Sequence, residues 1–200
     1  MKTFRKGGIH PAADKLTADQ MPVAIELPAM LKLMVSQGIG APPQPVVKAA
    51  DHVTTGQLIA KASAFVSSNL HSPCCGTVKK IEPIRTPQGL WQNAIVIEPD
   101  PEQPAPQFQK RSQAEVDALK PEEIIQIVAD AGIVGLGGAC FPTQVKMSVP
   151  AGKKAEAVIL NGAECEPYLT CDDVLMRQQA DNIIAGALLM LKATGAPRLI

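Results

Sequence analysis

The residues best suited to chemistry form a glycine-rich segment in the second half of the chain. Gly135, Gly137 and Gly138 stand within four positions, and Lys146 follows them. Glycine lets the backbone approach a ligand closely, and consecutive backbone N–H groups can surround an anion such as a phosphate. The segment therefore predicts a phosphate-binding loop. A glycine-rich turn that only packs closely is the alternative that the pattern leaves open.

This loop differs from the dinucleotide-binding fingerprint in two respects. Cys140 occupies the sixth position, where G-x-G-x-x-G requires glycine, and the segment before the loop is predicted to be a helix rather than a strand. We therefore exclude the standard Rossmann fingerprint and retain the phosphate-binding loop. Lys146 can pair with the phosphate, although a lysine that is simply solvated would give the same pattern.

A second candidate site follows the apolar run Ala157–Leu160. Asn161, Glu164 and Glu166 stand within six residues directly after this run. The run is typical of a buried parallel strand, and open α/β sheets bind ligands beyond the carboxyl ends of their strands. Amide and carboxylate groups there can bind the N–H, hydroxyl or amide groups of a ligand. A polar turn between strand and helix is the alternative.

Cysteine and histidine spacing does not indicate a metal centre. The five cysteines show no C-x-x-C pair, so neither a zinc ribbon nor an iron–sulfur site is predicted. Cys74 and Cys75 are expected to be free thiols, because a disulfide between neighbours would be strained. The histidines show no ligand spacing and are predicted to lie at the surface or in turns; they are His10, His52 and His71.

Residues 1–98 are predicted to be mostly β-structure, because short apolar runs alternate with glycine and proline. The runs are Val23–Leu27, Leu31–Val35, Pro45–Val47, Leu58–Ala60, Thr77–Ile81 and Ala94–Glu98. Segments 51–60 and 71–78 resemble the two halves of a lipoyl- or biotinyl-type barrel sandwich. The tip between them, roughly Phe65–Asn69, contains no lysine, and Lys61 lies in the preceding strand. A swinging-arm carrier function is therefore not expected.

The second half is predicted to be an α/β layer beyond a proline-rich linker at residues 99–120. A helix is expected over 121–132, with Pro121 in its first turn. A second helix should begin at a capping box, Thr170–Asp173. Its expected buried face consists of Met176, Ala180, Ile183, Ile184, Ala187, Leu188 and Leu191. The fold class is therefore α/β in the second half and α+β overall.

The composition excludes several kinds of partner. Nineteen Lys and Arg balance nineteen Asp and Glu, and this zero net charge argues against a nucleic-acid partner. Aromatic residues are 3% of the chain, so stacking platforms for bases are scarce. The N-terminus lacks a secretory apolar region, and no apolar stretch is long enough to span a membrane. We expect a soluble, intracellular chain.

Four segments resemble the RnfC family, the C-type subunits of Rnf/Rsx electron-transport complexes. They are Phe4–Pro11, His71–Val78, Gly135–Thr143 with Lys146, and Asn161–Tyr168, which occur in the same order as in that family. The second half is also similar to the flavin-binding subunit of respiratory complex I. The resemblance implies a barrel-sandwich hybrid domain over residues 1–98. It also implies an α/β flavin-binding domain over 121–200, of which the chain holds only the first part.

The same resemblance implies a function for this family, namely FMN-dependent oxidation of NADH, or its reverse, in an ion-translocating complex at the cytoplasmic face of the membrane. Electrons would pass through [4Fe–4S] clusters of a missing C-terminal part to the other Rnf subunits. The fragment alone is not expected to be active. Alternatives are a soluble electron carrier for a partner reductase and a non-catalytic docking module.

The resemblance also assigns roles to the candidate residues. The glycines and Lys146 would bind the flavin phosphate and ribityl chain, and Phe141 would form an aromatic wall for the dinucleotide. Asn161, Glu164 and Glu166 would face the isoalloxazine and the nicotinamide, with Glu164 as the catalytic residue. The complete set of implied cofactor-binding residues is Gly135, Gly137, Gly138, Phe141, Lys146, Asn161, Glu164 and Glu166.

Overall fold

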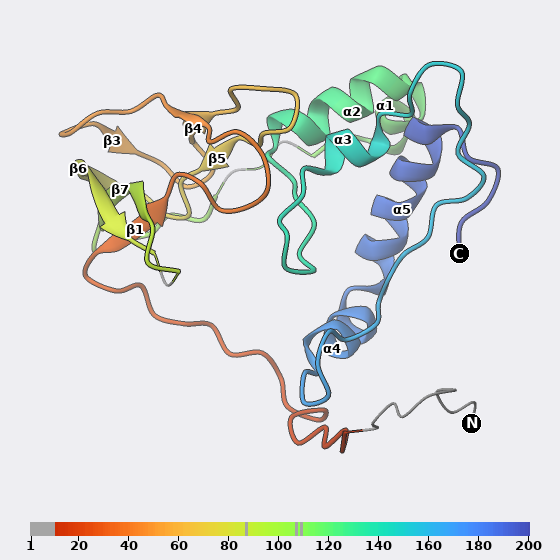
Figure 1. The fold of residues 1–200 in the computed structure, drawn as a ribbon, viewed down its shortest axis with the longest axis horizontal. Helices are drawn as coiled ribbons and strands as arrows, with labels where there is room; N and C mark the ends of the chain where they lie inside the picture. The colour runs from red at the N-terminus through yellow and green to blue at the C-terminus, as the bar shows by residue number, and fades with distance from the viewer. Residues whose placement is uncertain (1–10, 87, 107, 109) are drawn as a thin grey trace.

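The computed structural model describes residues 11–86, 88–106, 108 and 110–200. His10 and most of the Phe4–Pro11 motif lie outside the described residues. Strands occupy the first half of the chain, which we call the β domain, and helices occupy residues 113–200, which we call the helical half (Figure 1). The strands are β1 Leu31–Met34, β2 Gln44–Pro45, β3 His52–Val53, β4 Leu58–Lys61, β5 Leu70–His71, β6 Gly76–Arg85 and β7 Trp91–Pro99.

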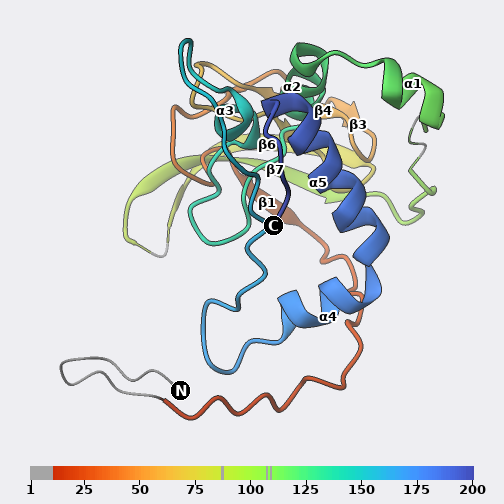
Figure 2. The same cartoon turned by 90° about the vertical axis from the view of Figure 1, so that its right-hand side faces the viewer.

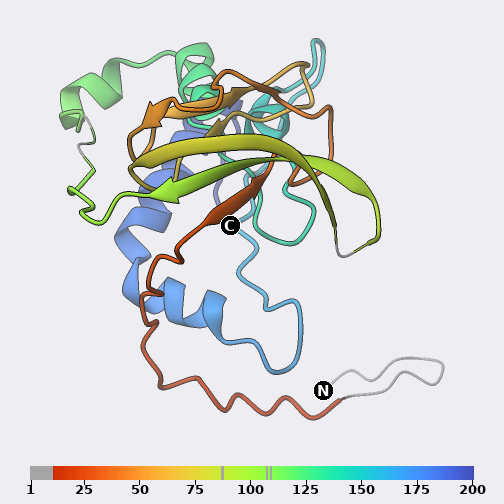
Figure 3. The ribbon, with the colours of Figure 1, turned by 90° about the vertical axis from the view of Figure 1, so that its left-hand side faces the viewer.

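The β domain consists of two antiparallel sheets with a closed core between them. One sheet has the strand order β1-β7-β6-β3 and the other has β2-β4-β5. Figure 3 shows the short orange strands lying over the long β6–β7 hairpin. Side chains from both sheets are completely buried in one cluster that includes Val53, Ile59, Val78, Ile95 and Ile97. The predicted β-structure is thus confirmed for the five apolar runs after residue 30.

The predicted strand at Val23–Leu27 is wrong. This segment is irregular, and Val23 and Ile25 are 87% and 94% exposed. Its alternating apolar residues fit a strand, but no neighbouring strand among the described residues pairs with it. Alternation alone does not make a strand where the backbone hydrogen bonds of a sheet are missing.

The helical half is held together by a second, smaller core. Its helices are α1 Gln113–Ala118, α2 Pro121–Asp130, α3 Thr143–Met147, α4 Cys171–Gln178 and α5 Ala180–Thr194 (Figure 2). Ile124 of α2, Met147 of α3 and Ala193 of α5 are the buried residues of this core. The helix predicted from Pro121 is present. No helix among the described residues is both long and apolar enough to cross a membrane.

Part of the predicted linker is helical. Helix α1 begins after Ser112, whose hydroxyl accepts from the Glu115 backbone N–H, while the Glu115 carboxylate accepts from the Ser112 backbone N–H. This capping box stabilises the first turn of a helix. Lys192 of α5 donates hydrogen bonds to the carbonyls of Val116 and Asp117, so α1 is tied to the helical half.

The predicted buried parallel strand at Ala157–Leu160 is reduced to one bridge. Val158 pairs with Leu199 in parallel, through bonds from Val158 N–H to the Arg198 carbonyl and from Ile200 N–H to the Val158 carbonyl, each 2.9 Å. Val158 is buried, whereas Ile159 is 68% exposed. The prediction of burial is wrong for Ile159 because one pairing leaves the other edge and face of the run open.

The predicted second helix is also different in detail. It is interrupted at Gln179, which separates α4 from α5. Of the seven residues expected on its buried face only Ala187 is fully buried, and Ile184 and Leu188 are 51% and 53% exposed. The expectation assumed a sheet beneath this face, and no such sheet exists among the described residues.

Candidate functional site

The glycine-rich segment enters from a complete C-terminal helix cap. Gly132 follows α2 with a φ of +65°, a left-handed conformation that glycine adopts without strain. Its N–H donates to the Ala129 carbonyl at 3.0 Å, and the Ile133 N–H donates to the Val128 carbonyl at 3.2 Å. These two bonds are the Schellman pair. They fix the direction in which the chain leaves α2.

Residues 135–141, which we call the glycine loop, are closed at their base. The Gly135 N–H donates to the Phe141 carbonyl at 2.9 Å, and the Thr143 N–H donates to the Ile133 carbonyl at 3.0 Å. Val134 and Pro142 form an antiparallel bridge just outside these residues. The base of the loop is therefore a short hairpin that leads directly into α3.

The tip of the glycine loop is open and has free hydrogen-bond donors. Leu136 is 89% exposed, and a Cβ atom added at Gly137 or Gly138 would meet nothing within 4 Å. Backbone N–H groups 136–139 donate no hydrogen bond to any described residue. Gly138 has a φ of +106° and Cys140 one of +47°, so the backbone turns sharply here. An open turn with unused N–H donors can accept an anion such as phosphate.

Lys146 lies beside this loop. A Cβ atom added at Gly135 would stand 2.9 Å from the Lys146 Nζ, so the absence of a side chain there makes room for the ammonium group. Among the described residues no carboxylate forms an ion pair with Lys146. The structure thus brings a cation to the anion-accepting loop. The role of this lysine stays a prediction.

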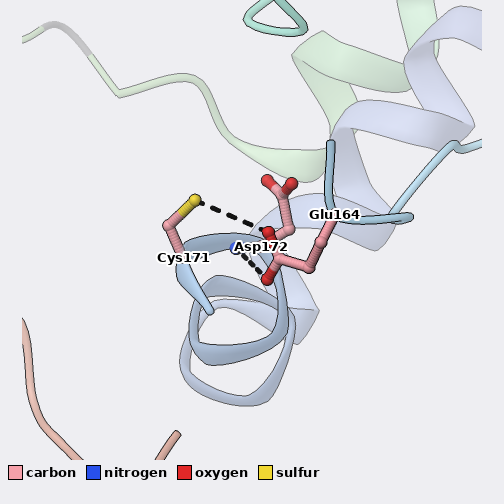
Figure 4. A group of neighbouring side chains, drawn as sticks. All are labelled: Glu164, Cys171 and Asp172. Atoms are coloured by element: carbon pink, nitrogen blue, oxygen red, sulfur yellow. Dashed lines mark hydrogen bonds between the residues drawn. The ribbon is translucent and has the colours of Figure 1, made fainter. Parts of the chain in front are cut away.

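The second candidate segment, residues 161–168, has a clear structural task. The Glu164 Oε1 accepts from the backbone N–H groups of Asp172 and Asp173, at 3.1 Å each (Figure 4). The Cys171 thiol donates to the other carboxylate oxygen at 3.7 Å. Glu164 therefore caps α4, where a carboxylate also interacts favourably with the helix dipole. Thr170, the predicted cap, makes no such bond.

Sequence reasoning missed this cap because a capping box spans only three residues. Glu164 acts from six residues before Thr170 and is brought there by the turn between them. The Thr170 hydroxyl instead meets Thr17 at 2.7 Å, and Lys15 donates to the Leu169 carbonyl at 2.6 Å. An N-terminal segment thus crosses the start of α4, and no sequence pattern indicated this contact.

Possible metal ligands gather at the same place. One ligand atom each from Glu164, Cys171 and Asp172 lie within 4.8 Å of one another. The cap already uses both Glu164 oxygens, so we assign this group to helix capping. Cys74 and Cys75 are free and buried, and burial raises the pKa of the Cys74 thiol. Among the described residues, no other His, Cys, Asp and Glu side chains meet in a set of three.

The structure does not join the two candidate segments. No hydrogen bond or ion pair among the described residues links the glycine loop to residues 161–168. Asn161 accepts a hydrogen bond from the Ala163 N–H within its own turn, and Glu166 is exposed. The glycine loop lies toward the β domain, whereas residues 161–168 lie beside α4 (Figures 1 and 2). Lys146 and the loop are thus together, and the three polar residues are apart.

Comparison with known families decides what this arrangement belongs to. A family model described as the RnfC barrel-sandwich hybrid domain matches residues 2–102. The chain belongs to the RnfC family. A second family model, the Nuo51 FMN-binding domain, matches residues 128–200, which contain both candidate segments. The predicted resemblance is confirmed, and with it a barrel-sandwich hybrid domain followed by helical structure of α+β class.

Curated relatives are similar along almost the whole chain. The RnfC protein of the Rhodobacter capsulatus ion-translocating oxidoreductase complex is 44% identical over 197 residues, which are 97% of this chain and 38% of the relative. Its counterpart in the Clostridium ljungdahlii proton-translocating ferredoxin:NAD(+) oxidoreductase complex is 42% identical, covering 96% and 42%. The Na(+)-translocating complex of Acetobacterium woodii has one that is 38% identical, covering 96% and 44%. The chain therefore spans about two fifths of these RnfC relatives.

Proposed function

We propose that this chain is a flavin-binding portion of an RnfC-type subunit and binds FMN at the glycine loop. The observation that carries the proposal is the open loop tip, with unused N–H donors and the Lys146 ammonium beside Gly135. This loop lies inside the region similar to an FMN-binding domain. The donor set fits a phosphate group, which accepts hydrogen bonds and carries negative charge.

The residues of the chain have distinct tasks in this proposal. Backbone N–H groups of Gly137 and Gly138 donate to the phosphate, and Lys146 neutralises its charge. Hydrogen bonds to charged groups contribute about 1.5–3 kcal/mol each. Phe141 provides an aromatic surface for the dinucleotide. Bound FMN supplies hydride exchange with NAD(H) and release of single electrons.

The three polar residues are proposed to orient the reacting rings. Asn161, Glu164 and Glu166 contact the isoalloxazine and the nicotinamide, with Glu164 as the catalytic residue. Because Glu164 also caps α4, the position of its carboxylate depends on that helix. The proposed task of Glu164 is thus coupled to the start of α4.

The proposal extends to the complex that the relatives' names describe. We propose a barrel-sandwich domain at 1–98, a connecting segment at 99–120 and a flavin domain from 121 onward. The whole protein would exchange electrons between NAD(H) and the other subunits of an ion-translocating complex, through [4Fe–4S] clusters outside this chain. A neutral chain would reach the cytoplasmic face of the membrane through protein partners rather than lipid charge.

FMN titration of the purified chain, followed by flavin fluorescence, tests the proposal. We expect saturable binding, and Lys146→Ala should weaken it by about tenfold, which corresponds to loss of about 1.4 kcal/mol. Lys153→Ala removes an exposed lysine outside the loop and is the matched control. Addition of NADH to the complex should then bleach the flavin absorbance.

Two results would contradict the proposal. Absence of FMN binding at millimolar concentration would favour the alternative of a docking module. Equal affinities of Lys146→Ala and Lys153→Ala would remove the ammonium group from the proposed phosphate site.

A further inference from the structure

The loop between β4 and β5, residues 62–69, is docked rather than free. In a swinging-arm domain this loop carries the modified lysine, and here it carries none. Ser67 is 2% exposed and donates from its hydroxyl to the Ala41 carbonyl at 2.8 Å. The Asn69 Oδ1 accepts from the Ala62 N–H at 2.8 Å, which closes the loop on itself. The loop is therefore a rigid projection of the β domain.

This projection contacts the elements that flank the glycine loop. The Gln144 Nε2 on α3 donates to the Ser67 carbonyl at 2.9 Å in a buried position. The Asn69 Nδ2 donates to the carbonyl of Asp130, the last residue of α2, at 3.1 Å. A Cβ added at Gly132 would stand 2.3 Å from the Asn69 carbonyl oxygen. Glycine at 132 is therefore required by the close approach as well as by its positive φ.

The β domain also contacts one limb of the glycine loop directly. The Ile39 N–H donates to the Ala139 carbonyl at 3.0 Å. A Cβ added at Gly38 would meet the Cys140 Cβ at 2.5 Å and the Ala139 carbonyl oxygen at 2.9 Å. Residues 38–41 are in turn bound to the projection, because the Ala41 N–H donates to the Val66 carbonyl at 2.8 Å. The two contacts thus form one continuous surface.

We propose that the β domain positions the glycine loop for FMN, with Asn69, Gln144 and Gly38 as positioning residues that do not touch the ligand. This inference rests on the proposed function. Fixing the backbone of a flexible loop costs about 1–2 kcal/mol per residue, and a loop that is already ordered binds its ligand more tightly. The tip makes no other backbone hydrogen bonds among the described residues, so its order depends on this surface.

The comparison of Gly132→Ala with Gly195→Ala tests the inference. Both glycines follow a helix, with φ values of +65° and +67°, so the backbone strain of alanine is the same. Only Gly132 faces another backbone, because a Cβ at Gly195 meets nothing within 4 Å. We expect FMN affinity to fall at least about tenfold more in Gly132→Ala, with both variants folded by circular dichroism.

A milder pair keeps the test decisive if Gly132→Ala fails to fold. Asn69→Ala removes the bond to Asp130, whereas Asn182→Ala removes an amide that bonds within the helical half. We expect about threefold weaker FMN binding for Asn69→Ala only. The alkylation rate of Cys140, measured by mass spectrometry against exposed Cys165, should rise in the same variant, because Cys140 packs against Gly38.

The outcomes separate this inference from the proposed function. Lack of FMN binding by the unmodified chain would overturn both. FMN binding by the unmodified chain, with equal affinities in Asn69→Ala and Asn182→Ala and an unchanged Cys140 rate, would overturn the positioning role alone.

Discussion

The β domain and the helical half bury their apolar residues to very different degrees. In the β domain, Ile59, Ile95 and Ile97 are completely buried between two sheets. In the helical half, Ile159 and Ile184 are mostly exposed on a strand and a helix. Antiparallel strands are joined by short turns, so neighbouring segments complete their own core. A parallel strand needs partners from distant segments, and here it has one bridge.

The candidate chemistry lies in the more open half. The glycine loop and residues 161–168 are connections with exposed polar groups, whereas the β domain supplies a rigid body beside them. Binding residues are commonly carried by loops that a stable scaffold positions. The difference between the halves is therefore one of task as well as of packing.

The largest effect should come from matched isoleucine substitutions in the two halves. Ile59→Ala empties a completely buried site and should lower the free energy of unfolding by about 2–5 kcal/mol. Ile159→Ala truncates an exposed side chain and should change it by no more than about 0.5 kcal/mol. Urea denaturation followed by circular dichroism measures both.

The reverse order would break the comparison between the halves. If Ile159→Ala were the more damaging change, the apolar run at 157–160 would be buried in solution by a contact that this structure does not contain. A second copy of the chain could make that contact, so sedimentation of the unmodified chain at several concentrations provides the control.

A smaller effect is expected at the start of α4. Glu164→Ala leaves two backbone N–H groups of the helix without their acceptor, which typically costs about 1 kcal/mol. Glu166→Ala is the matched control, because Glu166 is exposed and its side chain makes no hydrogen bond among the described residues. Thermal unfolding and the amide exchange of α4 are the measurements. Equal exchange in both variants would show that the cap does not stabilise α4 in solution.

Much of the fold could be predicted because its signals are local. Alternating apolar runs between turns indicated the strands after residue 30, and Pro121 with Gly132 marked the ends of a helix. The failures concern long-range partners. Val23–Leu27 has strand composition but no neighbour, and the predicted helix beyond Thr170 lacks the sheet that its apolar face presumes.

The candidate site divides along the same line. Proximity of Lys146 to the glycines follows from short sequence separation and a hairpin that leads into α3. The Glu164 cap and the contact between Asn69 and Asp130 depend on how segments return in space, and no motif spacing encodes that. Asn161 and Glu166 could be identified by residue type, but their distance from the loop could not.

The smallest predicted effect is a local response of α1 to pH, which leaves the β domain unchanged. The pKa of Glu115 is lowered because the Ser112 hydroxyl and backbone N–H donate to its carboxylate. A lowered pKa means that the carboxylate stabilises the helix above the pKa of the unfolded chain. This contribution is lost as the pH falls through the lower, folded value. NMR chemical shifts of α1 should therefore lose helical character in acid, while those of β6 and β7 stay constant. Ser112→Ala should reduce the helicity of α1 at neutral pH and flatten its acid response. An unaltered response in that variant would assign the change to another carboxylate.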